Sequence, residues 1–275
     1  MANASYPIFG KDVEFWLDTD DFLANELMEE AYRLGLKLQS IFNIFDRKSE
    51  ISRLNSKRML KASDELLLVL DKAIEICRLT GGLYDITHGR KFLARKKGEK
   101  LPKLSCSWKD IEISEKTVKL LHKDVWLDLG SIAKGYITDR IAEFFISEGV
   151  ESGYINARGD IWLIGEQPVD IKDPRKEGIL HTIQVKNKGV ATSGDYKQFD
   201  QDYSKSHVIN QGEVISATVV ANSLMMADAY ATVLMVCRKD LKTKLIMKIG
   251  FPAMTIDKLL EKTYYNGFDK LTNEN

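Results

Sequence analysis

The sequence predicts an α+β fold in which helices and strands follow one another without regular βαβ alternation. Three observations support this prediction. Apolar residues recur at helical spacing in a few long segments, and short β-rich segments crowd the second half of the chain. The 275 residues contain no internal repeat, low-complexity tract or linker, so we expect one domain over residues 1–275.

In the first half of the chain, residues 13–17 are expected to form a strand and residues 20–45 a long helix. Ser63 is a candidate N-cap for a second helix that ends before Gly81-Gly82. Residues 90–103, RKFLARKKGEKLPK, are strongly basic. We expect them to form an exposed loop, and the alternative is a docking surface for an acidic partner.

In the second half, the sequence pattern predicts short strands separated by helices. Residues 117–121 and 125–127 are expected to form a hairpin around His122-Lys123. Helices are expected at residues 132–147, 223–237 and 241–249, and strands at 154–156, 161–164, 179–185, 190–192 and 214–220.

The composition excludes several function classes. Because 40 basic and 40 acidic side chains cancel, a general nucleic-acid binder is not expected. No apolar run approaches the roughly 20 residues of a membrane span, and the first residues lack the pattern of a signal peptide. The three cysteines form no CxxC pair, so we expect buried free thiols and a cytoplasmic protein.

The segment from Asp128 to Tyr136, DLGSIAKGY, places a turn before the start of a helix. A helix N-terminus favours phosphate, because its N–H groups are free and its dipole end is positive. Lys134, one turn into the helix, could add a charge. The spacing matches neither a P-loop nor a dinucleotide fingerprint, so an ordinary helix start with Asp128 as its cap remains the alternative.

Asp228 and Thr232 lie four residues apart in ADAYAT, and therefore on one face of a helix. A carboxylate and a hydroxyl among small alanines leave room for a hard cation such as Mg²⁺, which prefers oxygen ligands and substrate phosphates. A purely structural role is the alternative. His207 follows the SGDY segment and could act as a general base, although a lone histidine can equally be structural.

Taken together and in order, these motifs resemble those of the ApbE family, the FAD:protein FMN transferases. The resemblance covers nearly the whole chain. The matching segments are SEISRLN (49–55), GGLYDITHG (81–89), DLGSIAKGYITD (128–139), SGDY (193–196), HVIN (207–210) and ADAYAT (227–232).

The resemblance implies that FAD is split at its pyrophosphate and that FMN is joined through its phosphate to a threonine or serine of an acceptor protein, releasing AMP. It implies Mg²⁺ held by Asp228, Thr232 and the Ser131 position, the last through its backbone carbonyl. His207 would help to deprotonate the acceptor hydroxyl, with Asp195 as a rival group. The FAD site would be lined by Phe9, Leu83, Tyr84, Asp85, Asp128 and Lys134.

The chain departs from the family pattern at two places. Arg158 replaces a glycine of the family's Gly-Gly-Asp, and the segment after His207 is shortened and lacks the usual Pro and Thr. The expected partner is an acceptor protein with an FMN-binding domain that carries the target residue, without nucleic acid or membrane. The competing functions are an FAD pyrophosphatase that gives FMN and AMP, and a non-catalytic FAD-binding protein.

Overall fold

The computed structural model describes residues 1–195 and 212–272 of the chain. Its centre is an eight-stranded sheet with the order β1-β2-β6-β7-β10-β11-β12-β13. All of its neighbouring strands are antiparallel. The strands are β1 (Ala2–Ile8), β2 (Lys11–Leu17), β6 (Gly153–Ala157), β7 (Asp160–Ile164), β10 (Gly189–Gly194), β11 (Val214–Ala221), β12 (Ala253–Asp257) and β13 (Lys262–Tyr265).

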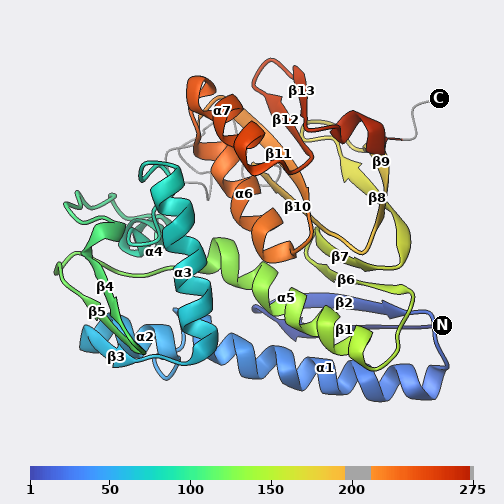
Figure 1. Cartoon of the computed structure of the whole chain (residues 1–275), viewed down its shortest axis with the longest axis horizontal. Helices are drawn as coiled ribbons and strands as arrows, with labels where there is room; N and C mark the ends of the chain where they lie inside the picture. Colours follow the sequence, from blue (N-terminus) through green and yellow to red (C-terminus); the bar gives the residue numbers. More distant parts are fainter. Residues whose placement is uncertain (196–211, 273–275) are drawn as a thin grey trace.

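Both faces of the sheet are covered, and β11 is buried at every position. Figure 1 shows the helices α1, α5, α6 and α7 around this sheet. Strands β8 (Glu166–Lys172) and β9 (Ile179–Lys186) form a separate two-stranded sheet. Its apolar residues pack with those of β7, β10, β11 and β12 in a second core. The helices are α1 (Asp21–Phe42), α5 (Gly130–Ser147), α6 (Leu224–Val236) and α7 (Lys239–Ile249).

The remaining elements form a smaller group on the left of Figure 1. It contains a three-stranded antiparallel sheet with the order β3-β5-β4. The first turn of α5 points toward this group, so the start of α5 lies where the two groups of elements meet (Figure 1). The elements are α2 (Glu50–Lys57), α3 (Asp64–Leu79), α4 (Gly89–Lys96), β3 (Met59–Lys61), β4 (Ile111–Ser114) and β5 (Thr117–Leu120).

Helices α5 and α6 approach each other closely at Gly135. A Cβ atom there would lie 2.4 Å from the carbonyl oxygen of Leu224, so only glycine fits. Asp139, one turn further along α5, accepts hydrogen bonds from the Ser223 hydroxyl (2.8 Å) and from the backbone N–H groups of Leu224 (2.6 Å) and Met225 (2.9 Å). It therefore satisfies N–H groups that the start of α6 leaves free.

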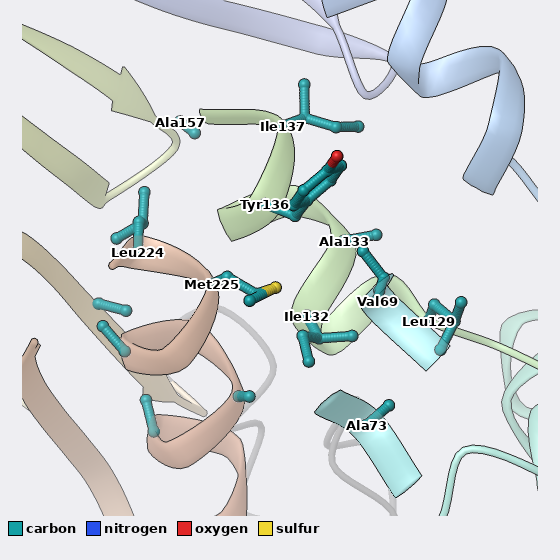
Figure 2. Close-up of a cluster of buried hydrophobic side chains, with 14 of the residues drawn as sticks. Val69, Ala73, Leu129, Ile132, Ala133, Tyr136, Ile137, Ala157, Leu224 and Met225 are labelled. Carbon is teal, nitrogen blue, oxygen red and sulfur yellow. The ribbon is translucent and has the colours of Figure 1, made fainter. Parts of the chain in front are cut away.

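Figure 2 shows the apolar core at this junction, where side chains of α3, α5 and α6 meet. Met225 of α6 points toward α5, near Ile132 and Tyr136. Ile132 and Met225 are buried, as is Val69 of α3. The core thus fixes three helices relative to one another, and the polar side chains on their other faces acquire a defined separation.

The predicted α+β class is confirmed, as are the helices and strands expected between residues 132 and 249 in the part of the chain that the structure describes. The prediction of a hairpin around His122-Lys123 is wrong. β5 pairs with β3 and β4 instead, whereas Trp126 donates to the Thr87 carbonyl (3.0 Å) and Asp128 to that of Ile86 (2.9 Å). Residues 125–127 are thus bound by a segment some 40 residues earlier, which local spacing does not reveal.

The prediction of a loop over residues 90–103 is wrong in its first half, because residues 89–96 form α4. Ala94 is buried and packs this helix against the protein. Arg95 and Lys96 lie in its last turn, where the helix dipole stabilises positive charge. The prediction of buried thiols is confirmed, since Cys77, Cys106 and Cys237 are free and buried. Among the described residues, no helix combines the length and apolarity required to cross a membrane.

Candidate functional site

Three charged side chains from three elements meet beside the α5–α6 junction, and we call them the buried charge cluster. The Nζ atom of Lys134 on α5 lies 3.1 Å from Oδ2 of Asp228 on α6, and it also contacts Oδ2 of Asp160 at the start of β7. Asp160 in turn accepts a hydrogen bond from the backbone N–H of Thr192 on β10 (2.9 Å). The contact at Gly135 brings the neighbouring Lys134 within reach of α6.

Burial dominates the electrostatics of this cluster. It raises the pKa of Asp228, and the attraction of Lys134 opposes that shift. Burial also lowers the pKa of Lys134, which the charge of Asp228 opposes. Oδ2 of Asp228 and Nζ of Lys134 form this ion pair without a hydrogen bond of normal geometry to the described residues. The cluster therefore holds a buried carboxylate against Lys134, and its oxygens are of the type that binds a hard cation.

Tyr84 and Ser131 join the predicted FAD loop to the start of α5. The Tyr84 hydroxyl and the Ser131 hydroxyl lie 2.9 Å apart. Burial raises the pKa of Tyr84, and the negative charges of Asp228 and Asp128 raise it further. The phenol consequently stays protonated near neutral pH. The structure thus brings the candidate residues Tyr84, Ser131, Asp128 and Asp228 close enough to influence one another.

Asp128 lies immediately before α5 and accepts a hydrogen bond from the backbone N–H of Gly130 (2.9 Å). Burial raises the pKa of its carboxyl group, and the Gly130 N–H opposes that shift. The residue at the N-cap of α5 is Leu129, and no side chain caps this helix. The Asp128 side chain therefore takes only the Gly130 N–H, and it lies at the positive end of the helix dipole.

Asp85 has a local structural role. It accepts hydrogen bonds from the backbone N–H (2.9 Å) and hydroxyl (2.7 Å) of Thr87, and from the backbone N–H of Trp108 (3.2 Å). These bonds hold the loop that carries Leu83 and Tyr84. Leu83 is half-buried and packs against the main core.

Thr232 lies one turn after Asp228 on α6, and its hydroxyl is 3.3 Å from that of Ser193 on β10. The carboxylate of Asp228, the hydroxyl of Thr232 and the backbone carbonyl of Ser131 are oxygen donors, the type that Mg²⁺ prefers. In the part of the chain that the structure describes, no three His, Cys, Asp or Glu side chains gather as a metal site. A magnesium ion here would depend on one carboxylate, neutral oxygens and substrate phosphates, which is common for this ion.

Two predicted residues are not brought into this group by the contacts of the described residues. Phe9 occupies the β1–β2 turn with a φ of 60°. It packs against the main core, and its backbone N–H donates to the Gln39 side chain of α1. His207 lies outside the described residues.

Asp195, the predicted rival of His207, is buried and paired with Arg175. The guanidinium donates to both carboxylate oxygens, at 2.7 and 2.9 Å. Such a bidentate pair stabilises the ionised carboxylate and fixes its geometry. The pair ties the loop after β8 to the end of β10, so Asp195 has a structural partner in this part of the protein.

Two charged residues, Asp160 and Arg175, were not among the predicted site residues. Asp160 belongs to the Arg158-Gly159-Asp160 segment, whose order in the family pattern could have indicated it. Arg158 and Gly159 form the turn between β6 and β7, with φ angles of 64° and 99°. The positive charge of Arg158 also acts on Lys134 and Asp228, as a smaller influence than burial and their mutual attraction.

Comparison with known proteins finds relatives that match most of the chain. The model of the ApbE family matches residues 9–255. A Vibrio cholerae protein named FAD:protein FMN transferase is 30% identical over 247 residues, covering 78% of this chain and 74% of its own. A Haemophilus influenzae protein of the same name is 27% identical over 251 residues, covering 77% of this chain and 72% of its own.

Solved structures share the fold. The flavin transferase ApbE from Vibrio cholerae aligns with a TM-score of 0.87 at 24% identity, over 98% of both chains. The ApbE protein from Thermotoga maritima aligns with a TM-score of 0.87 at 22% identity, over 99% of both. The family model spans most of the chain, including the segments that build the buried charge cluster, and the chain therefore belongs to the ApbE family.

Proposed function

We propose that this protein transfers FMN from FAD to a threonine or serine hydroxyl of an acceptor protein. The acceptor oxygen forms a bond to the FMN phosphorus, the pyrophosphate bond to the AMP phosphate breaks, and AMP leaves while the hydroxyl proton passes to a base. The names of the relatives support this reaction. The observation that carries the proposal is the meeting of Asp228 and Lys134 beside Tyr84 and Ser131.

The chain's own residues would supply binding and orientation. The start of α5 and Lys134 present positive charge to the pyrophosphate. We assign Phe9, Leu83, Tyr84, Asp85 and Asp128 to the walls of the FAD site. His207 is assigned as the group that takes the proton from the acceptor hydroxyl.

Asp228, Thr232 and the Ser131 position are assigned to Mg²⁺. When bound, the ion would offset charge on the pyrophosphate oxygens and on the departing AMP. The buried carboxylate of Asp228 and the hydroxyl of Thr232, one turn further along the same helix, support this assignment. Asp228 is already held against Lys134 by packing, so little rearrangement of α6 is required.

We propose an acceptor with an FMN-binding domain that carries the target residue, and we place the reaction in the cytoplasm. Three free, buried cysteines support a reducing compartment, because disulfides persist mainly in oxidising ones.

The test is a product assay with the purified protein, FAD and Mg²⁺, with and without a flavin-accepting domain. AMP release and flavin fluorescence of the denatured acceptor are followed together. We expect acceptor-bound flavin and an equal amount of AMP. AMP with free FMN regardless of acceptor would instead identify an FAD pyrophosphatase, and FAD binding with neither product a non-catalytic flavin-binding protein.

A further inference from the structure

An open cleft of about 370 Å³ runs along α4. Residues 90, 93, 94 and 97 form one wall, since they recur at helical spacing on one face of α4. The segment that follows α4 forms the other wall, and Trp126 contributes as well. We call this the basic cleft, which is lined by Arg90, Leu93, Ala94, Lys97, Glu99, Lys100, Pro102 and Trp126.

The positive charge here is unusually concentrated for this protein. Residues 90–103 hold seven of its 40 basic side chains and only one of its 40 acidic ones, in a chain without net charge. That single carboxylate, Glu99, lies 4.0 Å from Lys97. Lys91, Lys100 and Lys103 have no ion pair with any other described residue. The charges of these three lysines are therefore not neutralised by an ion pair within the described structure.

The fold does not require this charge. Lys97 and Lys100 lie beyond the last residue of α4 and are exposed, and such charges contribute little to stability. Arg90 is held by its contact with the Trp126 ring, 5.4 Å from the ring centre, but its charge remains exposed. Exposed cations that the fold does not need are available to attract a partner.

The basic cleft adjoins the candidate site. Gly89, the first residue of α4, packs so closely that a Cβ atom there would lie 2.7 Å from the Trp126 carbonyl oxygen and 3.0 Å from the Cβ of Asp128. Trp126 lines the cleft, and Asp128, two residues later, belongs to the proposed FAD site. A chain bound in the cleft would therefore lie near the Asp128 end of the proposed FAD site.

We propose that the basic cleft docks an acidic segment of the acceptor protein and so delivers its hydroxyl to the site. The charge selects an acidic partner, and the apolar side chains of Leu93, Ala94 and Pro102 offer contacts to an extended peptide. The identity of the partner as the acceptor rests on the proposed function, whereas the binding of an acidic peptide does not.

The first test measures binding without FAD. A short fluorescein-labelled peptide of Asp, Glu and Ser is titrated with the full-length protein, followed by fluorescence anisotropy at low and at physiological ionic strength. The double variant K97E/K100E should weaken binding about tenfold or more, because two attractions become repulsions. The double variant K97Q/K100Q should weaken it less, which also controls for any damage to α4 by reversed charges.

The matched control is K37E/K186E, which reverses two exposed lysines on α1 and β9 and should leave the affinity within about twofold after screening at physiological salt. Equal weakening by both double variants would overturn the proposal in favour of long-range attraction. No binding of the peptide to the unaltered protein would also overturn it. Tighter binding of an oligothymidylate than of the peptide would assign the cleft to nucleic acid instead.

The second test uses flavin transfer to an acceptor domain. In K97E/K100E the KM for the acceptor should rise about tenfold while kcat and the KM for FAD stay unchanged, because the cleft acts on docking alone. A fall in kcat with an unchanged acceptor KM would contradict docking. If no acceptor is flavinylated at all, the proposed function fails, and the peptide titration still decides whether the cleft binds acidic chains.

Discussion

Lys134 lies within helix α5 and Lys97 at the C-cap of α4, and their environments are opposite. The Lys134 side chain is 14% exposed and contacts two carboxylates from different elements. The Lys97 side chain is 68% exposed, and its nearest carboxylate, Glu99, is 4.0 Å away and two residues along the chain. The charge of Lys134 is therefore paired with carboxylates inside the protein, whereas the charge of Lys97 is exposed to solvent.

This difference indicates what each region can do. A buried charge without its partner is strongly destabilising, so a buried cluster resists substitution and holds a fixed geometry. An exposed charge contributes little to folding and is free to attract a partner in solution. We therefore expect substitutions in the cluster to act on stability and chemistry, and those in the cleft to act on association.

The largest effect on stability is expected for Lys134→Met, which leaves Asp160 and Asp228 buried without their cation. The free energy of unfolding, measured with urea, should fall by about 3–5 kcal/mol. The matched variant Lys97→Met should change it by less than about 0.5 kcal/mol. Equal decreases in the free energy of unfolding of the two variants would contradict the difference between the two lysines.

The next effect is expected for Asp228→Asn, which removes the only charged donor assigned to Mg²⁺. AMP release at saturating FAD should slow by about 10²-fold or more, since charge neutralisation of the pyrophosphate is lost. A Mg²⁺ titration should show a raised metal requirement. Asp71→Asn, an exposed aspartate on α3, should retain full activity. Unchanged turnover in Asp228→Asn at ordinary Mg²⁺ would remove Asp228 from the metal assignment.

A smaller effect on stability is expected for Asp139→Asn at the α5–α6 junction. An amide presents an N–H group where three donors now converge, so the free energy of unfolding should fall by about 1–3 kcal/mol near neutral pH. Asp71→Asn again serves as the exposed control.

Asp139 also predicts a pH dependence. Burial raises its pKa to about 6 from 3.8. Between these values the folded protein binds more protons than the unfolded chain, so the free energy of unfolding decreases as the pH rises from about 4 to about 6. Urea unfolding across this range should show that slope in the unaltered protein and a shallower one in Asp139→Asn. Identical slopes would contradict the raised pKa.

The smallest effect is expected at Arg158, an exposed charge beside the buried cluster. Its positive φ of 64° is unfavourable for a residue with a Cβ, so Arg158→Gly should raise the free energy of unfolding by about 0.5–1 kcal/mol. Loss of its charge should raise the KM for FAD about twofold to fivefold. Arg158→Lys should restore the KM without the gain in stability. An unchanged KM in Arg158→Gly would show that Arg158 does not contribute to FAD binding.

The parts of the fold that local patterns encode could be predicted. The long helix at the N-terminus, the helix begun by Ser63 and the placement of Asp228 and Thr232 on one helical face all follow from spacing and capping. The ordered motifs identified the family and most of the residues around the buried charge cluster. The prediction for the first half of the basic segment was wrong because its few apolar residues are separated by cations and show no clear helical pattern. Ala94 becomes buried only through tertiary packing.

The sequence by itself determined most of the elements, the family and the residue types available for chemistry, because these depend on neighbours along the chain. Only the tertiary structure decided which distant groups meet. The contact of Lys134 with Asp160 needs the register of β7, and its contact with Asp228 needs the close approach at Gly135. Likewise, the pairing of Arg175 with Asp195 and the joining of Trp126 to α4 depend on long-range packing, which no periodicity along the chain records.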